Sequence, residues 1–232
     1  MPDNPARNQA VVFDLDDTLY AERDYVLSGY GAVSEYLSDD PARAARMRMW
    51  LWERFLGGRA GGAFDALNEN FSLGLEARQI AELVEVYRNH SPRIAPRAGI
   101  PRLLEKLHRG SRLGIISDGF LPAQKLKLDA LGIAGHFDAV IFTEALGRES
   151  WKPSPDGFQA FCKELQLDAA NCTYVADNPA KDFAAPNTLG WRTVQLLLDG
   201  QIHSRKPAPT GGEAQIIVKS IDELESTVDP TG

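Results

Sequence analysis

Three carboxylates and a hydroxyl follow directly on an apolar run near the start of the chain. The run Val11–Phe13 is typical of a buried parallel strand, and it is followed by Asp14, Asp16, Asp17 and Thr18. Asp14 and Asp16 are two residues apart and therefore point the same way on an extended backbone. Two carboxylates that close repel each other unless a cation or a shared proton separates them. Because α/β sheets place their chemistry beyond the carboxyl ends of strands, this stretch indicates a metal-assisted carboxylate site.

Later apolar runs also end in polar residues, which a parallel sheet would bring to the same edge. These residues are Ser117 with Asp118 and Gly119, then Lys152, then Asp177 with Asp182. Each group taken alone is equally typical of a turn, a solvated lysine or a helix cap. Their joint occurrence after successive strands is what points to one shared site.

From about residue 96 onward the pattern alternates between strand and helix. Short apolar strands are expected at 113–116, 139–142, 173–176, 193–198 and, as an edge strand, 216–218. Helices are expected at 100–108, 121–131, 156–165, 180–189 and 221–224, and the glycines Gly132 and Gly190 stop two of them. Repeated strand–helix units predict a parallel sheet with helices on both faces.

The segment between the first strand and this alternating part has a purely helical pattern. Helices are expected at 24–38, 42–56, around 64–71 and at 76–90, with a glycine-rich run at 57–62. An insertion at the carboxyl end of the first strand must hang over any site that the strand carries. The sequence therefore predicts a Rossmann-like α/β core (1–20 and 96–232) and an inserted all-helical cap domain (21–95) that acts as a lid.

Composition excludes several functional classes. The chain has 232 residues, 44% of them hydrophobic, and a net charge of −7, so a large core is expected and a basic nucleic-acid-binding surface is not. The two cysteines, Cys162 and Cys172, lack metal-ligand spacing and fit a reducing compartment. We find no pattern typical of a signal peptide and no apolar run of the ~18 residues needed to span a membrane. We expect a cytoplasmic protein, monomeric or homodimeric, without nucleic-acid or membrane partners.

Taken together, the motifs resemble those of the haloacid dehalogenase superfamily, in the subfamily with a helical cap inserted after the first motif. The resemblance covers roughly Val11 to the C-terminus and rests on four motifs in the family's order and spacing. They are Asp14-Leu15-Asp16-Asp17-Thr18, Ser117, Lys152-Pro153-Ser154-Pro155, and Asp177 with Asp182.

This resemblance implies a magnesium-dependent phosphatase mechanism. Asp14 would attack phosphorus and form an aspartyl-phosphate, and Asp16 would be the general acid and base. Lys152 would place a positive charge against Asp14 and the transferred group. The metal ligands would be the Asp14 side chain, the Asp16 main-chain carbonyl and the Asp177 side chain. Asp182 would hold metal waters or orient Lys152.

Substrate binding is assigned to the first two motifs and to one residue of the helical insertion. Ser117, with the amides of Asp118 and Gly119, would hydrogen-bond phosphoryl oxygens near a helix start, and Thr18 joins them. Relatives commonly carry Asn at position 118, and a carboxylate aimed at phosphate would repel it. The Asp118 side chain is therefore expected to face the cap or solvent. Arg59, in its glycine-rich loop, is a candidate contact for a second anionic group, although a solvated loop arginine is the alternative.

The sequence is compatible with several functions. The leading one is a phosphomonoesterase acting on a small phosphorylated metabolite such as a sugar phosphate or nucleotide, since a closing lid excludes bulky substrates. A phosphomutase would retain both aspartates, although such relatives tend to have Gly where this chain has Asp17. A haloacid dehalogenase would attack carbon without a metal and would lack Asp16. A catalytically silent binding module would have lost a nucleophile, a lysine or a metal ligand, and none is missing.

Overall fold

The computed structural model describes residues 7–229, and the chain divides into two compact units. The first holds the residues up to Arg23 together with those from Ala95 onward, and the second is Asp24–Ile94. We call them the sheet unit and the helical unit. The expected boundaries at residues 21 and 95 lie within three residues of these.

Within the described residues, the sheet unit is built on a parallel sheet of six strands in the order β3-β2-β1-β4-β5-β6. The strands are β1 (Ala10–Phe13), β2 (Arg112–Ser117), β3 (Ala139–Phe142), β4 (Cys172–Ala176), β5 (Arg192–Leu196) and β6 (Ile216–Val218). The strand order reverses at β1, which is the point where doubly wound sheets place their ligands. The α/β fold class predicted from the sequence is confirmed.

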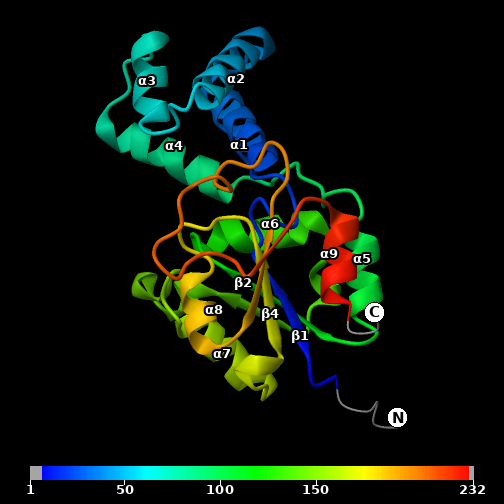
Figure 1. Cartoon of the computed structure of the whole chain (residues 1–232). Helices are drawn as coiled ribbons and strands as arrows, with labels where there is room; N and C mark the ends of the chain where they lie inside the picture. Colours follow the sequence, from blue (N-terminus) through cyan, green and yellow to red (C-terminus); the bar gives the residue numbers. More distant parts are fainter. Residues whose placement is uncertain (1–6, 230–232) are drawn as a thin grey trace. The chain divides into compact units, whose positions relative to one another are not determined.

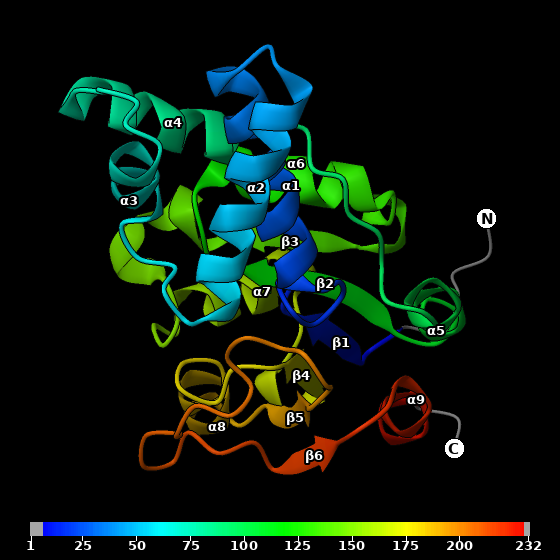
Figure 2. The ribbon, with the colours of Figure 1, turned by 90° about the horizontal axis from the view of Figure 1, so that it is seen from above.

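Helices cover both faces of this sheet (Figure 2). They are α5 (Ile100–Leu107), α6 (Leu121–Leu131), α7 (Asp156–Leu165), α8 (Ala184–Leu189) and α9 (Ile221–Val228). In Figure 2, α7 and α8 lie on one side of the sheet, and α5 and α9 lie on the other. All four residues of β1 are buried, because both of its faces are covered, which explains its uninterrupted apolar sequence.

The core under α7 and α8 is aromatic. Phe158 and Phe161 of α7 pack with Trp191 and with Tyr174 of β4. A Cβ at Gly114 of β2 would come within 2.0 Å of the Phe161 ring. Glycine in this strand therefore makes room for the ring, and the packing holds α7 against β2 and β4.

The helical unit contains α1 (Glu22–Leu37), α2 (Pro41–Leu56), α3 (Ala63–Asn70) and α4 (Ala77–Asn89), which appear in blue and cyan in Figure 1. Glu22 and Arg23, the first residues of α1, belong to the sheet unit. The helical unit has a core of its own, formed by Val26, Tyr30, Val33, Met47, Leu51, Phe64, Leu67 and Leu83. Such a core is expected of a unit that folds as an inserted domain.

The chain leaves and re-enters the sheet unit at one place. Tyr20 and Pro96 form an antiparallel bridge, and the Arg97 N–H donates to the Leu19 carbonyl at 2.9 Å. The two connections to the helical unit therefore run side by side. Among the described residues, no helix has the length and apolar character needed to span a membrane.

Two expected elements differ from the structure. The helix expected at 180–189 begins only at Ala184, because a turn closed by Asp182 precedes it. The Asp182 carboxylate accepts from the Asn178 N–H at 2.9 Å, and the Asp182 N–H donates to the Asn178 carbonyl at 3.0 Å. The last helix is longer than expected and runs to Val228.

Candidate active site

The register of the central strands places the first and fourth motifs side by side. Phe13 lies opposite Ile115 of β2 and Val175 of β4, and the Asp14 N–H continues the ladder by donating to the Val175 carbonyl at 2.9 Å. Asp14 therefore stands at the tip of β1. Ser117 ends β2 on one side of it, and Asp177 follows β4 on the other.

Lys152 is buried against the tip of β1, and its ammonium group has three partners. The Lys152 Nζ lies 2.5 Å from Asp14 Oδ1, 2.8 Å from Asp182 Oδ1 and 2.8 Å from the Tyr174 hydroxyl. The Lys152 side chain has no exposed surface. Burial alone would lower the pKa of Lys152, but Asp14 and Asp182 hold it well above its ordinary value. Lys152 is therefore a permanent cation aimed at Asp14.

Asp14, Asp177 and Asp182 form a buried acidic cluster whose nearest oxygens all lie within 4.8 Å of one another. Within the described part of the chain, Asp177 Oδ2 is buried and has no hydrogen-bond partner. Burial, together with the neighbouring carboxylates Asp182 and Asp14, raises the pKa of Asp177 to about 9. Burial likewise raises the pKa of Asp14 to about 7, although Lys152 lowers it.

These carboxylates fit a divalent cation. An orphaned buried carboxylate oxygen is costly, and a hard cation with oxygen ligands removes that cost. Asp182 already binds Lys152 through Oδ1 and the Asn178 N–H through Oδ2, so it supports the cluster. Asp14 and Asp177 are the side chains with oxygens left to offer.

Asp16 is held by side chains that the sequence analysis did not single out. Its Oδ1 lies 2.7 Å from Lys127 Nζ and accepts from the Tyr20 hydroxyl, and its Oδ2 accepts from Gln124 Nε2 at 2.9 Å. Burial would raise the pKa of Asp16, but Lys127, Tyr20 and Gln124 lower it overall. In this arrangement Asp16 is ionised, which is the state of a general base.

The loop after β2 is fixed by Gln124 of α6. Gln124 Nε2 lies 2.7 Å from both Ser117 Oγ and the Asp118 carbonyl. Gly119 has a φ of +125°, and a Cβ there would come within 3.0 Å of the Gln124 side chain. Glycine is thus required both by the backbone conformation and by the close approach of Gln124.

The expectation that the Asp118 side chain faces the cap or solvent is wrong. The side chain is only 5% exposed, and both of its oxygens are bound. Oδ1 accepts from Thr143 Oγ1 at 2.9 Å and from the Lys152 N–H at 3.1 Å, and Oδ2 lies 2.8 Å from Lys181 Nζ. Position 118 therefore tolerates a carboxylate because hydrogen bonds and a lysine satisfy it inside the protein.

Asp17 and Thr18 complete the turn after β1, and both are buried. Asp17 has a φ of +54°, a conformation that favours glycine. Its carboxylate accepts from the main-chain N–H groups of Glu22 and Ile202 and from Arg97, so these bonds offset the backbone strain. Among the residues described, Thr18 Oγ1 is buried without a hydrogen-bond partner, and its contact with a substrate stays a prediction.

Several functional neighbours escaped the sequence analysis: Tyr20, Gln124, Lys127, Thr143, Tyr174 and Lys181. Gln124 and Lys127 could have been identified from the sequence, because they are polar residues three apart on one face of a helix that follows Ser117. Tyr174 could not, since an aromatic residue in a buried strand is typical of the core.

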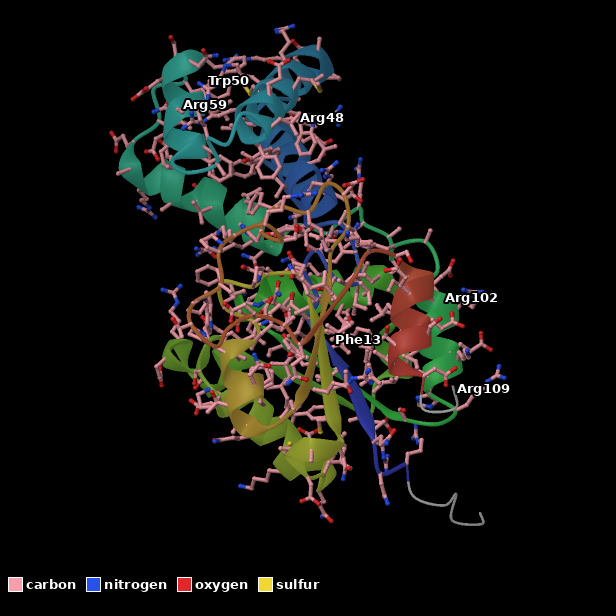
Figure 3. All side chains as sticks on the ribbon, in the orientation of Figure 1. Phe13, Arg48, Trp50, Arg59, Arg102 and Arg109 are labelled. Carbon is pink, nitrogen blue, oxygen red and sulfur yellow. The ribbon has the colours of Figure 1, made fainter. Side chains whose placement is uncertain are left out.

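Arg59 lies on the exposed loop between α2 and α3 of the helical unit (Figure 3). Its contact with a substrate stays a prediction.

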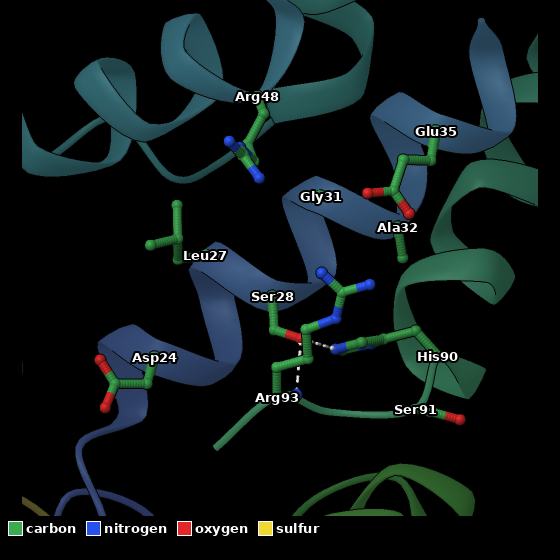
Figure 4. A pocket seen from close by; sticks show the side chains of 10 residues that line it. All are labelled: Asp24, Leu27, Ser28, Gly31, Ala32, Glu35, Arg48, His90, Ser91 and Arg93. Atoms are coloured by element: carbon green, nitrogen blue, oxygen red, sulfur yellow. Dashed lines mark hydrogen bonds between the residues drawn. The ribbon is translucent and has the colours of Figure 1, made fainter. Parts of the chain in front are cut away.

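In the helical unit, a cavity of about 430 Å³ is lined by α1, Arg48 and the segment that follows α4 (Figure 4). Ser28 Oγ there lies 3.0 Å from His90 Nε2 and accepts from the Arg93 N–H at 2.9 Å. His90 is buried and helps join the two ends of the unit.

Comparison with known proteins places the chain in a family. A family model described as a haloacid dehalogenase-like hydrolase matches residues 9–190. Glyceraldehyde 3-phosphate phosphatase from Methanocaldococcus jannaschii is 29% identical over 197 residues, which cover 82% of this chain and 85% of that protein.

Solved structures share the fold. A putative hydrolase of this family from Bacillus subtilis, bound to magnesium, has a TM-score of 0.66 at 20% identity, and the match covers 97% of this chain and 100% of that one. L-2-haloacid dehalogenase from Xanthobacter autotrophicus has a TM-score of 0.60 at 20% identity over 97% of this chain and 99% of that one. The chain belongs to the haloacid dehalogenase-like hydrolase family. Since this fold hosts both phosphatases and dehalogenases, the residues of the site must decide between them.

Proposed function

We propose that the protein is a magnesium-dependent phosphomonoesterase that acts on a small phosphorylated metabolite through an aspartyl-phosphate on Asp14. The observation that carries this proposal is the surroundings of Asp14. Its carboxylate faces the buried Lys152, and it shares an acidic cluster with Asp177, which has an unsatisfied oxygen. This arrangement supports a nucleophile that works beside a cation.

Phosphoryl transfer is the chemistry that uses all of these groups. A carboxylate and a phosphate dianion repel each other, and Mg²⁺ held by Asp14, the Asp16 carbonyl and Asp177 would neutralise that repulsion. An Asp14 oxygen forms the new bond to phosphorus while the ester oxygen leaves. Lys152 remains beside Asp14 and stabilises the charge on the transferred group. Ser117 Oγ accepts from Gln124 and donates a long bond of 3.5 Å to the Asp118 carbonyl, which a stronger bond to a phosphoryl oxygen would replace.

Asp16 distinguishes this proposal from dehalogenation, because a departing alkoxide needs a proton and the aspartyl-phosphate needs an activated water. In the second step Asp16 takes the proton of the attacking water, and its ionised state in this structure fits that step. In the first step it must carry a proton, which the pairing with Lys127 disfavours. Asp16 therefore has to part from Lys127 during the cycle.

The substrate class follows from the family's small-molecule chemistry and from the relative that acts on glyceraldehyde 3-phosphate. We propose a short phosphorylated metabolite, with the helical unit acting as a cap that closes over it. Arg59 is the candidate contact for a second polar or anionic group. Arg59→Ala is then expected to raise KM for the true substrate more than for a generic aryl phosphate, and equal losses on both would reject the contact.

The test is phosphate release from a panel of phosphorylated metabolites, with and without Mg²⁺. We expect turnover that needs the metal and that Asp14→Asn reduces at least ~10³-fold. A matched control is Asp129→Asn, an exposed carboxylate of α6. Turnover that persists in Asp14→Asn, or that ignores Mg²⁺, would overturn the mechanism.

A further inference from the structure

Asp118 poses an electrostatic problem for the function proposed above. It directly follows Ser117, in the loop assigned to phosphate binding, and it is buried. Burial would raise the pKa of Asp118, but Lys152, Lys181 and hydrogen bonds lower it below its ordinary value. A permanent negative charge thus lies beside a site that must accept a phosphate dianion.

Lys181 lies on the opposite side of the site and reaches across to this charge. It belongs to the turn between β4 and α8, next to Asp182, and its Nζ lies 2.8 Å from Asp118 Oδ2. Asp118 follows β2, and β2 and β4 are the two strands that flank β1. The ion pair therefore joins the loops on both sides of Asp14.

Lys152 also lowers the pKa of Asp118 through its charge, but its ammonium group lies against other partners. Its Nζ hydrogen-bonds Asp14 and the Tyr174 hydroxyl and lies 2.8 Å from Asp182 Oδ1, and its main-chain N–H is the group that hydrogen-bonds Asp118. Thr143 supplies a neutral hydroxyl. Among the described residues, Lys181 is thus the one whose side-chain cation is paired with the Asp118 carboxylate.

We propose that Lys181 is a positioning residue that compensates the Asp118 carboxylate, so that the Ser117–Gly119 loop accepts a phosphate dianion. Lys181 acts through Asp118 and need not touch the substrate. The inference deepens the proposed function and rests on it. The lysine on the neighbouring loop makes the buried carboxylate tolerable next to the phosphate-binding loop.

A purely structural role for the pair makes a different prediction. If Lys181 only tied two loops together, its loss would lower stability, and removing the Asp118 charge would break the same tie without restoring anything. If Lys181 compensates charge, asparagine at position 118 should rescue its loss. Asparagine keeps an oxygen for Thr143 and for the Lys152 N–H, and it removes the charge.

The experiment measures inorganic phosphate binding by calorimetry in the presence of Mg²⁺, together with kcat and KM on an aryl phosphate. The variants are Lys181→Met, Lys181→Arg and the double variant Asp118→Asn with Lys181→Met. Lys163→Met, at an exposed lysine of α7, is the matched control. Thermal stability is recorded for each variant.

We expect Lys181→Met to raise the Kd for phosphate and the KM by about 10- to 100-fold, with a smaller change in kcat. The double variant should recover at least about tenfold of that loss, Lys181→Arg should stay near wild type, and Lys163→Met should be unchanged. A double variant as weak as Lys181→Met, or a Lys181→Met that behaves like Lys163→Met, would overturn the inference. If the wild-type protein neither releases nor binds phosphate, the proposed function falls and takes this inference with it. Wild-type turnover without any effect at Lys181 would reject the inference alone.

Discussion

The two ends of the strands in the sheet carry charge clusters of opposite character. At the carboxyl ends, Asp14, Asp177 and Asp182 lie close together, and the buried ammonium group of Lys152 contacts Asp14 and Asp182. At the amino ends, Asp138, just before β3, is bound by two arginines: Arg7 Nη2 at 2.9 Å and Arg112 Nη1 at 3.0 Å. One cluster has more carboxylates than cations, and the other has more cations than carboxylates.

The pKa values of the carboxylates differ between the two clusters in the direction that these charges predict. Burial and neighbouring carboxylates raise the pKa of Asp177 to about 9. At the other end, burial would raise the pKa of Asp138, but the Leu113 N–H, Arg112 and Arg7 lower it below its ordinary value. Asp138 therefore stabilises the fold as an ion, whereas the Asp14 cluster is a strained arrangement that a cation or a ligand relieves. The Asp138 cluster thus stabilises the sheet, whereas the Asp14 cluster consists of residues that the sheet positions for chemistry.

Loss of the Lys152 ammonium group, which contacts both Asp14 and Asp182, should have the largest effect on stability. We expect Lys152→Met to lower the free energy of unfolding by about 3–5 kcal/mol, because it leaves buried carboxylates without a partner. Urea unfolding measures this change. The matched variant at the amino end is Arg112→Met, whose arginine is 43% exposed and whose carboxylate keeps Arg7; a cost of at most about 1 kcal/mol is expected. Equal losses at the two ends would contradict the comparison.

Asp138→Asn tests whether the amino-end cluster is purely structural. The substitution should cost about 1–3 kcal/mol at neutral pH, because Asp138 accepts bonds from Arg7, Arg112 and the Leu113 N–H. The folded-state pKa lies below the unfolded value of about 3.9, so this stability is present above about pH 5 and is lost as pH falls through the folded pKa. The difference between wild type and variant, measured by urea unfolding across pH, should shrink toward pH 2. Turnover should be retained, and its loss would tie this end of the sheet to the site.

Asp177→Asn should have an effect on stability of the opposite sign. The folded-state pKa of about 9 exceeds the unfolded value, so in metal-free protein the stability contributed by Asp177 falls as pH rises from about 4 toward 9. Metal-free Asp177→Asn should therefore be more stable than wild type at pH 7, by roughly 1 kcal/mol or more, and equal to it near pH 3.

Thermal unfolding with and without Mg²⁺ completes the Asp177 test. The ion should raise the Tm of the wild-type protein and have little effect on Asp177→Asn. A metal-free variant less stable than wild type would show that the Asp177 carboxylate stabilises the apo fold, and the contrast between the two ends would fail.

The sequence by itself determined the strand tips and their chemistry. The run before Asp14 is apolar throughout because both faces of strand β1 are covered. The parallel register of the neighbouring strands then brings Ser117 and Asp177 to either side of Asp14. The helical insertion was readable from its 3.6-residue periodicity and from the absence of a strand between residues 21 and 95. These features are local or follow from period and order, which is why the α/β class could be predicted.

Only the tertiary structure decided how each charge is satisfied. Asp16, Asp118 and Lys152 could be named from the sequence, but their partners could not. These partners come from segments far along the chain: Lys127 on α6, Lys181 on the turn after β4, and Tyr174 within β4. The direction of a carboxylate depends on which cation the fold brings within about 3 Å, and nothing local encodes that distance. For this reason the residue types at the site were predictable, whereas the orientation of Asp118 and the pairing of Asp16 were not.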